Sequence, residues 1–267
     1  MDPALREGYE TARRMLRRHD PTYYLATRRL PAAVRPATYA LYGFVRTADQ
    51  LVDGPRRAAT PERRRAALDA WEEQLRAPSH PITRALDDAA ARHALPLGEL
   101  RQYMRSMRLD SAGRVRIESW EELQAYMDGS AGTVGRIMAA LLGLPARHHG
   151  DLGRLGVAFQ LANFIRDVRE DRRLDRIYLP AEDRASFGVR ESDLDGTGPA
   201  LRALLAHEVG RARDLFASAR PAIAAAPPSV RPGVRLAVAL YERMLRTDRP
   251  TGVRVWHLPG AAFEALR

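Results

Sequence analysis

The stretch Phe159-Gln-Leu-Ala-Asn-Phe-Ile-Arg-Asp-Val-Arg-Glu-Asp171 decides the fold class of this chain. Its apolar residues recur three or four positions apart, which is the spacing of one face of an α-helix. The predicted helix ends in an Asp-x-x-x-Asp motif formed by Asp167 and Asp171. Residues four positions apart lie on one helix face, about 5–6 Å from each other, so the two carboxylates are expected to point to the same place.

An earlier stretch, Tyr39-Ala-Leu-Tyr-Gly-Phe-Val-Arg-Thr-Ala-Asp-Gln-Leu-Val-Asp53, ends in the same way, with Asp49 and Asp53 four positions apart. Like charges on one face destabilise an isolated helix, so a group outside the helix is expected to compensate for them. One such motif is most often a solvated helix end, but two of them after apolar helices favour a binding site. Mg²⁺ takes oxygen ligands and is typically held by one or two carboxylates together with substrate phosphates. The sequence therefore predicts a Mg²⁺ site for a diphosphate between two facing helices.

Apolar positions at helical spacing cover most of the remaining chain, and long alternating β patterns are missing, which predicts an all-α fold. Prolines and other breakers divide the chain into segments. The predicted helices are Pro3–Arg18, Pro31–Asp53, Pro61–Arg76, Pro81–His93, Pro96–Met107, Trp120–Leu142, Asp151–Arg172, Pro199–Ala225 and Pro228–Thr247. The stretch 174–198, rich in Asp, Gly and Ser, is expected to be a connector rather than a domain linker. We therefore expect one all-α domain over residues 1–267.

The composition narrows the function classes. The chain has 267 residues, of which 45% are apolar and 28% charged, and it contains no cysteine, which excludes disulfides and thiolate nucleophiles. No apolar run of about 18 residues and no export signal are present, so we expect a cytoplasmic location. The net charge of +10 comes from arginines spread along the chain, which is typical of a solvated basic surface. No nucleic-acid partner is expected, and peripheral association with the inner membrane surface is an open alternative.

Four stretches carry a family resemblance. They are HDPTYYLATRRLP from His19, ALYGFVRTADQLVD to Asp53, YMDGSAGTVG from Tyr126 and QLANFIRDVREDRRLDRIYLP from Gln160. On these stretches the chain resembles the squalene/phytoene synthase family of trans-isoprenyl diphosphate synthases, nearest to actinobacterial phytoene synthase-like enzymes. The resemblance extends from about Pro3 to Pro259. It implies an isoprenoid synthase fold, an all-α helical bundle around a central cavity.

The resemblance also implies roles for individual residues. Asp49, Asp53, Asp167 and Asp171 match the Mg²⁺-binding carboxylates on opposite walls of the cavity, and Tyr126 matches a tyrosine near the carbocation. These five form the implied catalytic set. The residues implied to bind the substrate are His19, Thr22, Arg46, Ala131, Val134, Gly135, Gln160, Asn163, Arg176, Tyr178 and Tyr241. Arg46, Arg176 and Tyr178 among them are expected to hold diphosphate oxygens, since arginine is suited to bidentate phosphate contact.

The implied function is a Mg²⁺-dependent prenyl transfer. An isoprenyl diphosphate of C10 to C20 is ionised, and the allylic cation is coupled to a second isoprenyl diphosphate. Ionisation separates a carbocation from pyrophosphate, so positive groups must neutralise the leaving group while the cation stays in a dry, apolar cavity. Two alternatives remain open. One is transfer of the prenyl group to an aromatic acceptor such as a carbazole, and the other is a basic helical protein that binds nucleic acid.

Three departures from the family pattern bear on the acceptor. Gln50 follows the first aspartate where a second aspartate is common. Asp128 and Ser130 stand at positions that are often apolar or aromatic, which predicts a more polar part of the prenyl pocket. The segment from Tyr241 to Arg254 is about one helical turn shorter than usual. These differences suit a non-isoprenoid acceptor, but they leave the ionisation of a diphosphate unchanged.

Overall fold

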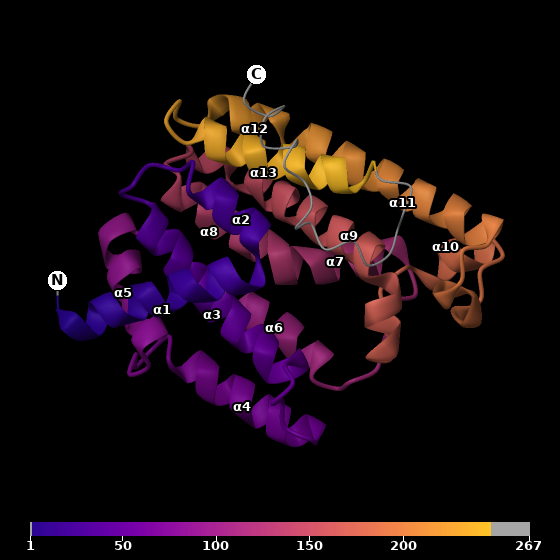
Figure 1. The fold of residues 1–267 in the computed structure, drawn as a ribbon, viewed down its shortest axis with the longest axis horizontal. Helices are drawn as coiled ribbons and strands as arrows, with labels where there is room; N and C mark the ends of the chain where they lie inside the picture. Colours follow the sequence, from indigo (N-terminus) through magenta and orange to yellow (C-terminus); the bar gives the residue numbers. More distant parts are fainter. Residues whose placement is uncertain (1, 247–267) are drawn as a thin grey trace.

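Helix α9 (His149–Arg173) is the longest helix of the computed structural model, which describes residues 2–246. It packs against α8 (Thr133–Leu141) and α11 (Pro199–Ser218), and its second half carries the later acidic motif. In Figure 1 the C-terminal helices, in orange and yellow, form one edge of the bundle, and α4 lies at the opposite edge. The helical architecture confirms the all-α expectation.

The N-terminal half supplies the other acidic helix. Helices α1 (Pro3–His19), α3 (Arg35–Asp53) and α5 (Pro81–His93) pack on one another. The remaining helices are α2 (Pro21–Thr27), α4 (Pro61–Glu73), α6 (Glu99–Asp110), α7 (Trp120–Met127), α10 (Ala181–Ser186), α12 (Arg220–Ala225) and α13 (Arg231–Met244), with 3₁₀ turns at Ala146–His148 and Glu191–Asp195. Buried side chains such as Phe44 and Phe216 fill the core between the helices.

Several boundaries differ from the sequence-based prediction, and the predicted helix Pro199–Ala225 is divided into α11 and α12. Helix α3 begins at Arg35 rather than Pro31, because residues 31–34 form a turn closed by the Val34 N–H and the Pro31 carbonyl. The predicted helix Trp120–Leu142 is interrupted by a π-helical turn at Asp128–Gly132, where the small residues Gly129-Ser-Ala-Gly132 favour a break or kink. The predicted connector 174–198 contains α10 and the short strand β2 (Arg176–Ile177), which pairs in parallel with β1 (Val115–Arg116).

The sequence analysis also did not predict the separate helix α2. Asp20 ends α1 and caps α2, since its carboxylate accepts a hydrogen bond from the Tyr23 N–H at 2.8 Å. Pro21 then occupies the first position of α2, where the missing N–H costs nothing. This break turns the chain so that α2 packs against α13 and closes one side of the cavity described below.

Two glycines mark the close approach of α9 to α8 and to the π-helical turn before α8. A Cβ atom on Gly135 would lie 2.4 Å from the Leu152 carbonyl oxygen, and one on Gly156 would lie 2.4 Å from the Ala131 carbonyl oxygen. Both distances are far inside van der Waals contact. The small residue expected at position 135 for a prenyl chain is thus also required by the packing of the two helices.

We predict opposite effects of alanine at two helical glycines. Gly135→Ala should lower the free energy of unfolding by about 1–3 kcal/mol, because the added methyl group overpacks the backbone of α9. Gly210 lies in α11 with open space around its Cα, so Gly210→Ala should be neutral or stabilising by up to about 1 kcal/mol. Urea unfolding followed by circular dichroism measures both. Equal stability of the two variants would contradict the close approach of α8 and α9.

Candidate active site

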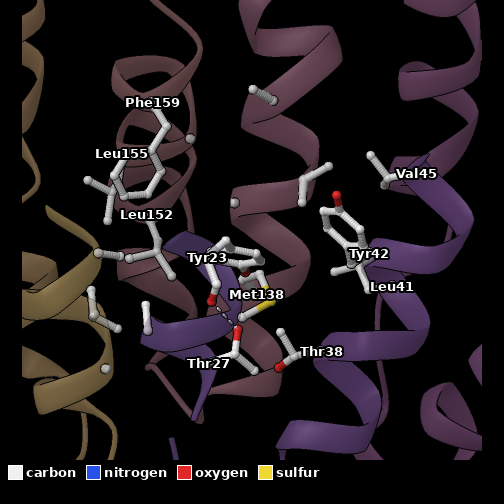
Figure 2. A pocket seen from close by; sticks show the side chains of 18 of the residues that line it. Tyr23, Thr27, Thr38, Leu41, Tyr42, Val45, Met138, Leu152, Leu155 and Phe159 are labelled. Atoms are coloured by element: carbon white, nitrogen blue, oxygen red, sulfur yellow. Dashed lines mark hydrogen bonds between the residues drawn. The ribbon is translucent and has the colours of Figure 1, made fainter. Parts of the chain in front are cut away.

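A cavity of about 250 Å³ lies between α2, α3, α8, α9 and α13. Its walls are mainly apolar, and in Figure 2 side chains from opposite sides face it: Leu152, Leu155 and Phe159 of α9, and Leu41, Tyr42 and Val45 of α3. Thr27 and Thr38 also line it, but each hydroxyl donates to a carbonyl of its own helix, Tyr23 O at 2.8 Å and Val34 O at 3.1 Å. Such walls suit a long apolar ligand.

The first acidic motif lies at the C-terminal end of α3. Asp49 forms an ion pair with Arg46 on the same helix. Asp53 accepts a hydrogen bond from Arg176 Nη1 at 2.6 Å. Arg176 comes from β2, and its Nη2 also donates to the Asp110 carbonyl at 3.1 Å. The predicted diphosphate ligand Arg176 is therefore also the group that fixes Asp53.

The second acidic motif lies at the C-terminal end of α9. Asp167 accepts a hydrogen bond from Arg166 Nε at 2.6 Å. The Asp171 carboxylate forms no hydrogen bond or ion pair within residues 2–246. Burial raises the pKa of Asp171 to about 8, with further increases from Asp167 and from Asp53 on the other acidic helix. Burial likewise raises the pKa of Asp49 to about 6, and Asp53 adds to that increase.

The two acidic motifs belong to one site, because Arg176 on β2, which packs against α9, binds Asp53 at the end of α3. The charges collected there are the carboxylates of Asp49, Asp53, Asp110, Asp167 and Asp171 and the guanidinium groups of Arg46, Arg166 and Arg176. Five carboxylates against three arginines give the site an excess of acidic groups, and burial is the main cause of the raised pKa values of Asp49 and Asp171. An oxygen-only donor set with excess negative charge fits Mg²⁺.

Asp110, at the end of α6, is a site residue that the sequence analysis missed. It is 4% exposed and accepts hydrogen bonds from the Tyr126 hydroxyl at 2.5 Å and the Tyr178 hydroxyl at 3.3 Å. The Tyr178 ring stacks on Phe164 with a centroid separation of 3.9 Å. Burial raises the pKa of Asp110 to about 7. No spacing or motif marks Asp110 in the sequence, because its partners come from distant segments.

His19 and Gln50 lie beside the first motif. His19 Nδ1 is 3.5 Å from Arg46 Nη2, and His19 Nε2 is 3.4 Å from the Gln50 side-chain nitrogen. Burial and the charge of Arg46 lower the pKa of His19. The glutamine that departs from the family pattern thus contacts His19. Thr22 is not among the described residues that line the cavity.

Most of the other predicted substrate-binding residues do line the cavity. Those that do are Ala131, Val134, Gly135, Gln160 and Tyr241. Asn163 does not line the cavity, and its Oδ1 is buried without a hydrogen-bond partner in the described part of the chain. The structure therefore places these residues together, and their contacts with a substrate stay predictions.

Of the two polar residues expected in the wall of the prenyl pocket, only Ser130 lines the cavity. The prediction for Asp128 is wrong, because its carboxylate accepts a hydrogen bond from Arg136 Nη1 at 2.7 Å and the residue does not line the cavity. Ser130 does line it, and its hydroxyl is buried without a hydrogen-bond partner within residues 2–246. Arg254 and the rest of the shortened segment after residue 246 lie outside the described residues.

A separate acidic cluster is formed by Asp183, His207 and Glu208 on α10 and α11. Arg211 already binds it, with Nη2 at 3.1 Å from Asp183 Oδ1 and Nη1 at 3.0 Å from Glu208 Oε1. The guanidinium group also lies over the Trp120 ring, 4.3 Å from the centroid. This arginine-centred ion pair holds three helices together and is not a candidate metal site.

None of the helices in the described chain has the length and apolarity needed to span a bilayer.

Comparisons with known proteins agree with this geometry. Residues 16–257 match the family model of squalene/phytoene synthase. The phytoene synthase of Arthrospira platensis is 36% identical over 265 residues, covering 91% of this chain and 84% of the relative. Squalene synthase HpnC from Alicyclobacillus acidocaldarius has a similar crystal structure, with a TM-score of 0.81 and 30% identity over 92% of this chain and 94% of that chain. A dehydrosqualene synthase crystallised with a ligand gives a TM-score of 0.82 and 26% identity, covering 90% and 85% of the two chains.

Proposed function

The chain belongs to the squalene/phytoene synthase family and is a prenyltransferase that couples isoprenyl diphosphates, and we propose that its reaction begins between the two acidic motifs with Mg²⁺ as cofactor. The observation that supports this is the meeting of Asp53 on α3 and Asp171 on α9 beside Arg176, next to an apolar cavity. Asp49 and Asp167 complete the proposed metal-binding set. Mg²⁺ bound there would neutralise charge that develops on the leaving diphosphate.

The arginines are proposed to hold the diphosphate oxygens. The Nε atoms of Arg46 and Arg176 are buried and have no acceptor within the described chain. A buried donor without a partner costs about 1–3 kcal/mol, so a ligand rich in acceptor oxygens is favoured there. Because Arg176 also binds Asp53, it links the placement of the carboxylates to that of the diphosphate.

The cavity is proposed to receive the prenyl chain and to protect the allylic cation. Its apolar walls exclude water, which would otherwise capture the cation as an alcohol. The hydroxyl proton of Tyr126 is engaged by Asp110, so the tyrosine oxygen can face a cation with its lone pairs while its ring is held in place. The stacked rings of Phe164 and Tyr178 lie beside Tyr126, outside the described lining of the cavity, and aromatic faces attract positive charge.

Product analysis tests the proposed function and its acceptor. Purified protein with Mg²⁺ is incubated with C10, C15 and C20 prenyl diphosphates, each alone and with indole or carbazole compounds, and the products are identified by mass spectrometry. We expect a hydrocarbon with twice the carbon number of the substrate. The unpartnered Ser130 hydroxyl in the described part of the wall favours a polar, aromatic acceptor instead. A prenylated aromatic without any such hydrocarbon would reject head-to-head coupling.

Peripheral membrane contact is a further part of the proposal. Leu25 on α2, the helix that closes one side of the cavity, is 41% exposed, and the exposed Arg28 and Arg29 lie in the turn that follows this helix. An apolar side chain with adjacent arginines suits an anionic bilayer surface. Co-sedimentation with anionic vesicles tests this contact, and the absence of salt-sensitive binding would reject it.

A further inference from the structure

Asp20 is the one carboxylate that lines the cavity within the described chain. It lies between α1 and α2, where one carboxylate oxygen accepts the Tyr23 N–H at 2.8 Å. No other hydrogen bond to this carboxylate exists among residues 2–246. Capping α2 therefore uses only part of its acceptor capacity, and the rest is available to the cavity.

The surroundings of Asp20 place it at the junction of the apolar cavity and the charged end of the site. Burial raises its pKa, whereas Arg166 and Arg46, the arginines of the two acidic motifs, lower it. Three phenols also lie near it, because the charge of Asp20 contributes to the raised pKa values of Tyr23, Tyr42 and Tyr241. When a diphosphate is held by Arg46, the first carbons of the prenyl chain must pass this junction.

The coupling reaction requires a base close to the cation that it forms. Joining an allylic cation to a second alkene or to an aromatic ring leaves a new cation, which becomes a neutral product by losing a proton. The C–H bond breaks, and its electron pair forms a bond to the positively charged carbon, which becomes neutral. The proton passes to an acceptor. A carboxylate with little water around it is a stronger base than one in solution, while a neutral phenol is a weak one.

We propose that Asp20 is the catalytic proton acceptor that discharges the coupled cation. This inference rests on the proposed function, and it holds for a prenyl or an aromatic acceptor because both couplings end in loss of a proton. Asp20 releases the proton to solvent when the product leaves. Asp20 thereby has two tasks: one carboxylate oxygen caps α2, and the other, which forms no hydrogen bond within residues 2–246, accepts the proton.

The test separates ionisation from coupling. Asp20→Asn keeps the shape and the helix cap, because Asn and Asp cap helices about equally well, but an amide is not a base. With Mg²⁺ and the prenyl diphosphate used by the wild type, we expect the variant to release pyrophosphate while the ratio of coupled product to pyrophosphate falls at least about tenfold. The prenyl alcohol formed by water capture should rise correspondingly.

Two further variants keep the test decisive. Asp20→Ser also retains a capping side chain and should show the same fall, which guards against a folding defect in one variant. Asp2→Asn makes the same exchange at the cap of α1, where Asp2 accepts the Ala4 N–H at 3.2 Å outside the cavity, and should leave the ratio unchanged.

An unchanged ratio in both Asp20 variants would overturn the inference. Loss of pyrophosphate release in both, with normal circular dichroism, would also overturn it, because Asp20 would then act in binding or ionisation. A wild type that releases no pyrophosphate would instead reject the proposed function.

Discussion

Asp171→Asn is expected to lower pyrophosphate release from a prenyl diphosphate at least about 100-fold, which is a loss of about 2.7 kcal/mol in transition-state stabilisation. The amide has no charge with which to hold a divalent cation. Thermal stability, in contrast, should stay the same or rise. Asp171 is partly buried, is repelled by Asp167 and Asp53, and forms no ion pair in the described chain, so its removal relieves repulsion.

The measurements are steady-state pyrophosphate release and melting by circular dichroism. Asp214→Asn is the matched control, because Asp214 lies on the exposed face of α11 and should keep full activity. Asp49→Asn and Asp167→Asn are expected to behave like Asp171→Asn. Retention of more than about a tenth of the wild-type activity, a loss below about 1.4 kcal/mol, would contradict a role for that residue in binding metal.

Arg176→Ala is expected to lower kcat/KM at least about 100-fold and also to destabilise the protein by about 3–5 kcal/mol. Arg176 is 5% exposed and binds both the Asp53 carboxylate and the Asp110 carbonyl, so its loss leaves a partly buried carboxylate and a buried carbonyl without their donor. Asp171→Asn and Arg176→Ala should thus both lower activity strongly. The first should leave the stability unchanged or raise it, whereas the second should lower it.

Arg176→Lys distinguishes a bidentate contact from a simple charge. A lysine ammonium cannot reproduce the planar fork that reaches Asp53 and Asp110 together, so this variant should regain part of the stability but little of the activity. Arg173→Ala, at an exposed arginine near the end of α9, is the control and should retain activity. Full activity of Arg176→Lys would show that position 176 contributes only a charge.

The acidic motifs were predictable because a helix fixes the position of residues four apart. Asp49 with Asp53, and Asp167 with Asp171, therefore share a helix face whatever the tertiary structure is. That the two pairs face each other is a tertiary property, and the sequence suggested it only through the chemistry of a shared cation. The parallel pairing of Arg176 with Val115, which aims the arginine at Asp53, has no signal in two-residue strands.

Other features depend on how distant segments pack. Asp110 reads as an ordinary helix end, and only the arrival of Tyr126 and Tyr178 makes it part of the site. Asp128 was expected in the prenyl pocket. It is instead the first residue of the π-helical turn, and its carboxylate binds Arg136. Asp20 followed by Pro21 is a common start of a helix, so its position on the cavity wall became apparent only from the break between α1 and α2.

The stoichiometry of pyrophosphate and hydrocarbon tests the central claim most directly. With purified protein and one prenyl diphosphate as the sole organic substrate, we predict Mg²⁺-dependent turnover that releases two pyrophosphates for each coupled hydrocarbon and that stops when EDTA removes the metal. Absence of metal-dependent pyrophosphate release from every C10, C15 and C20 substrate would contradict the account.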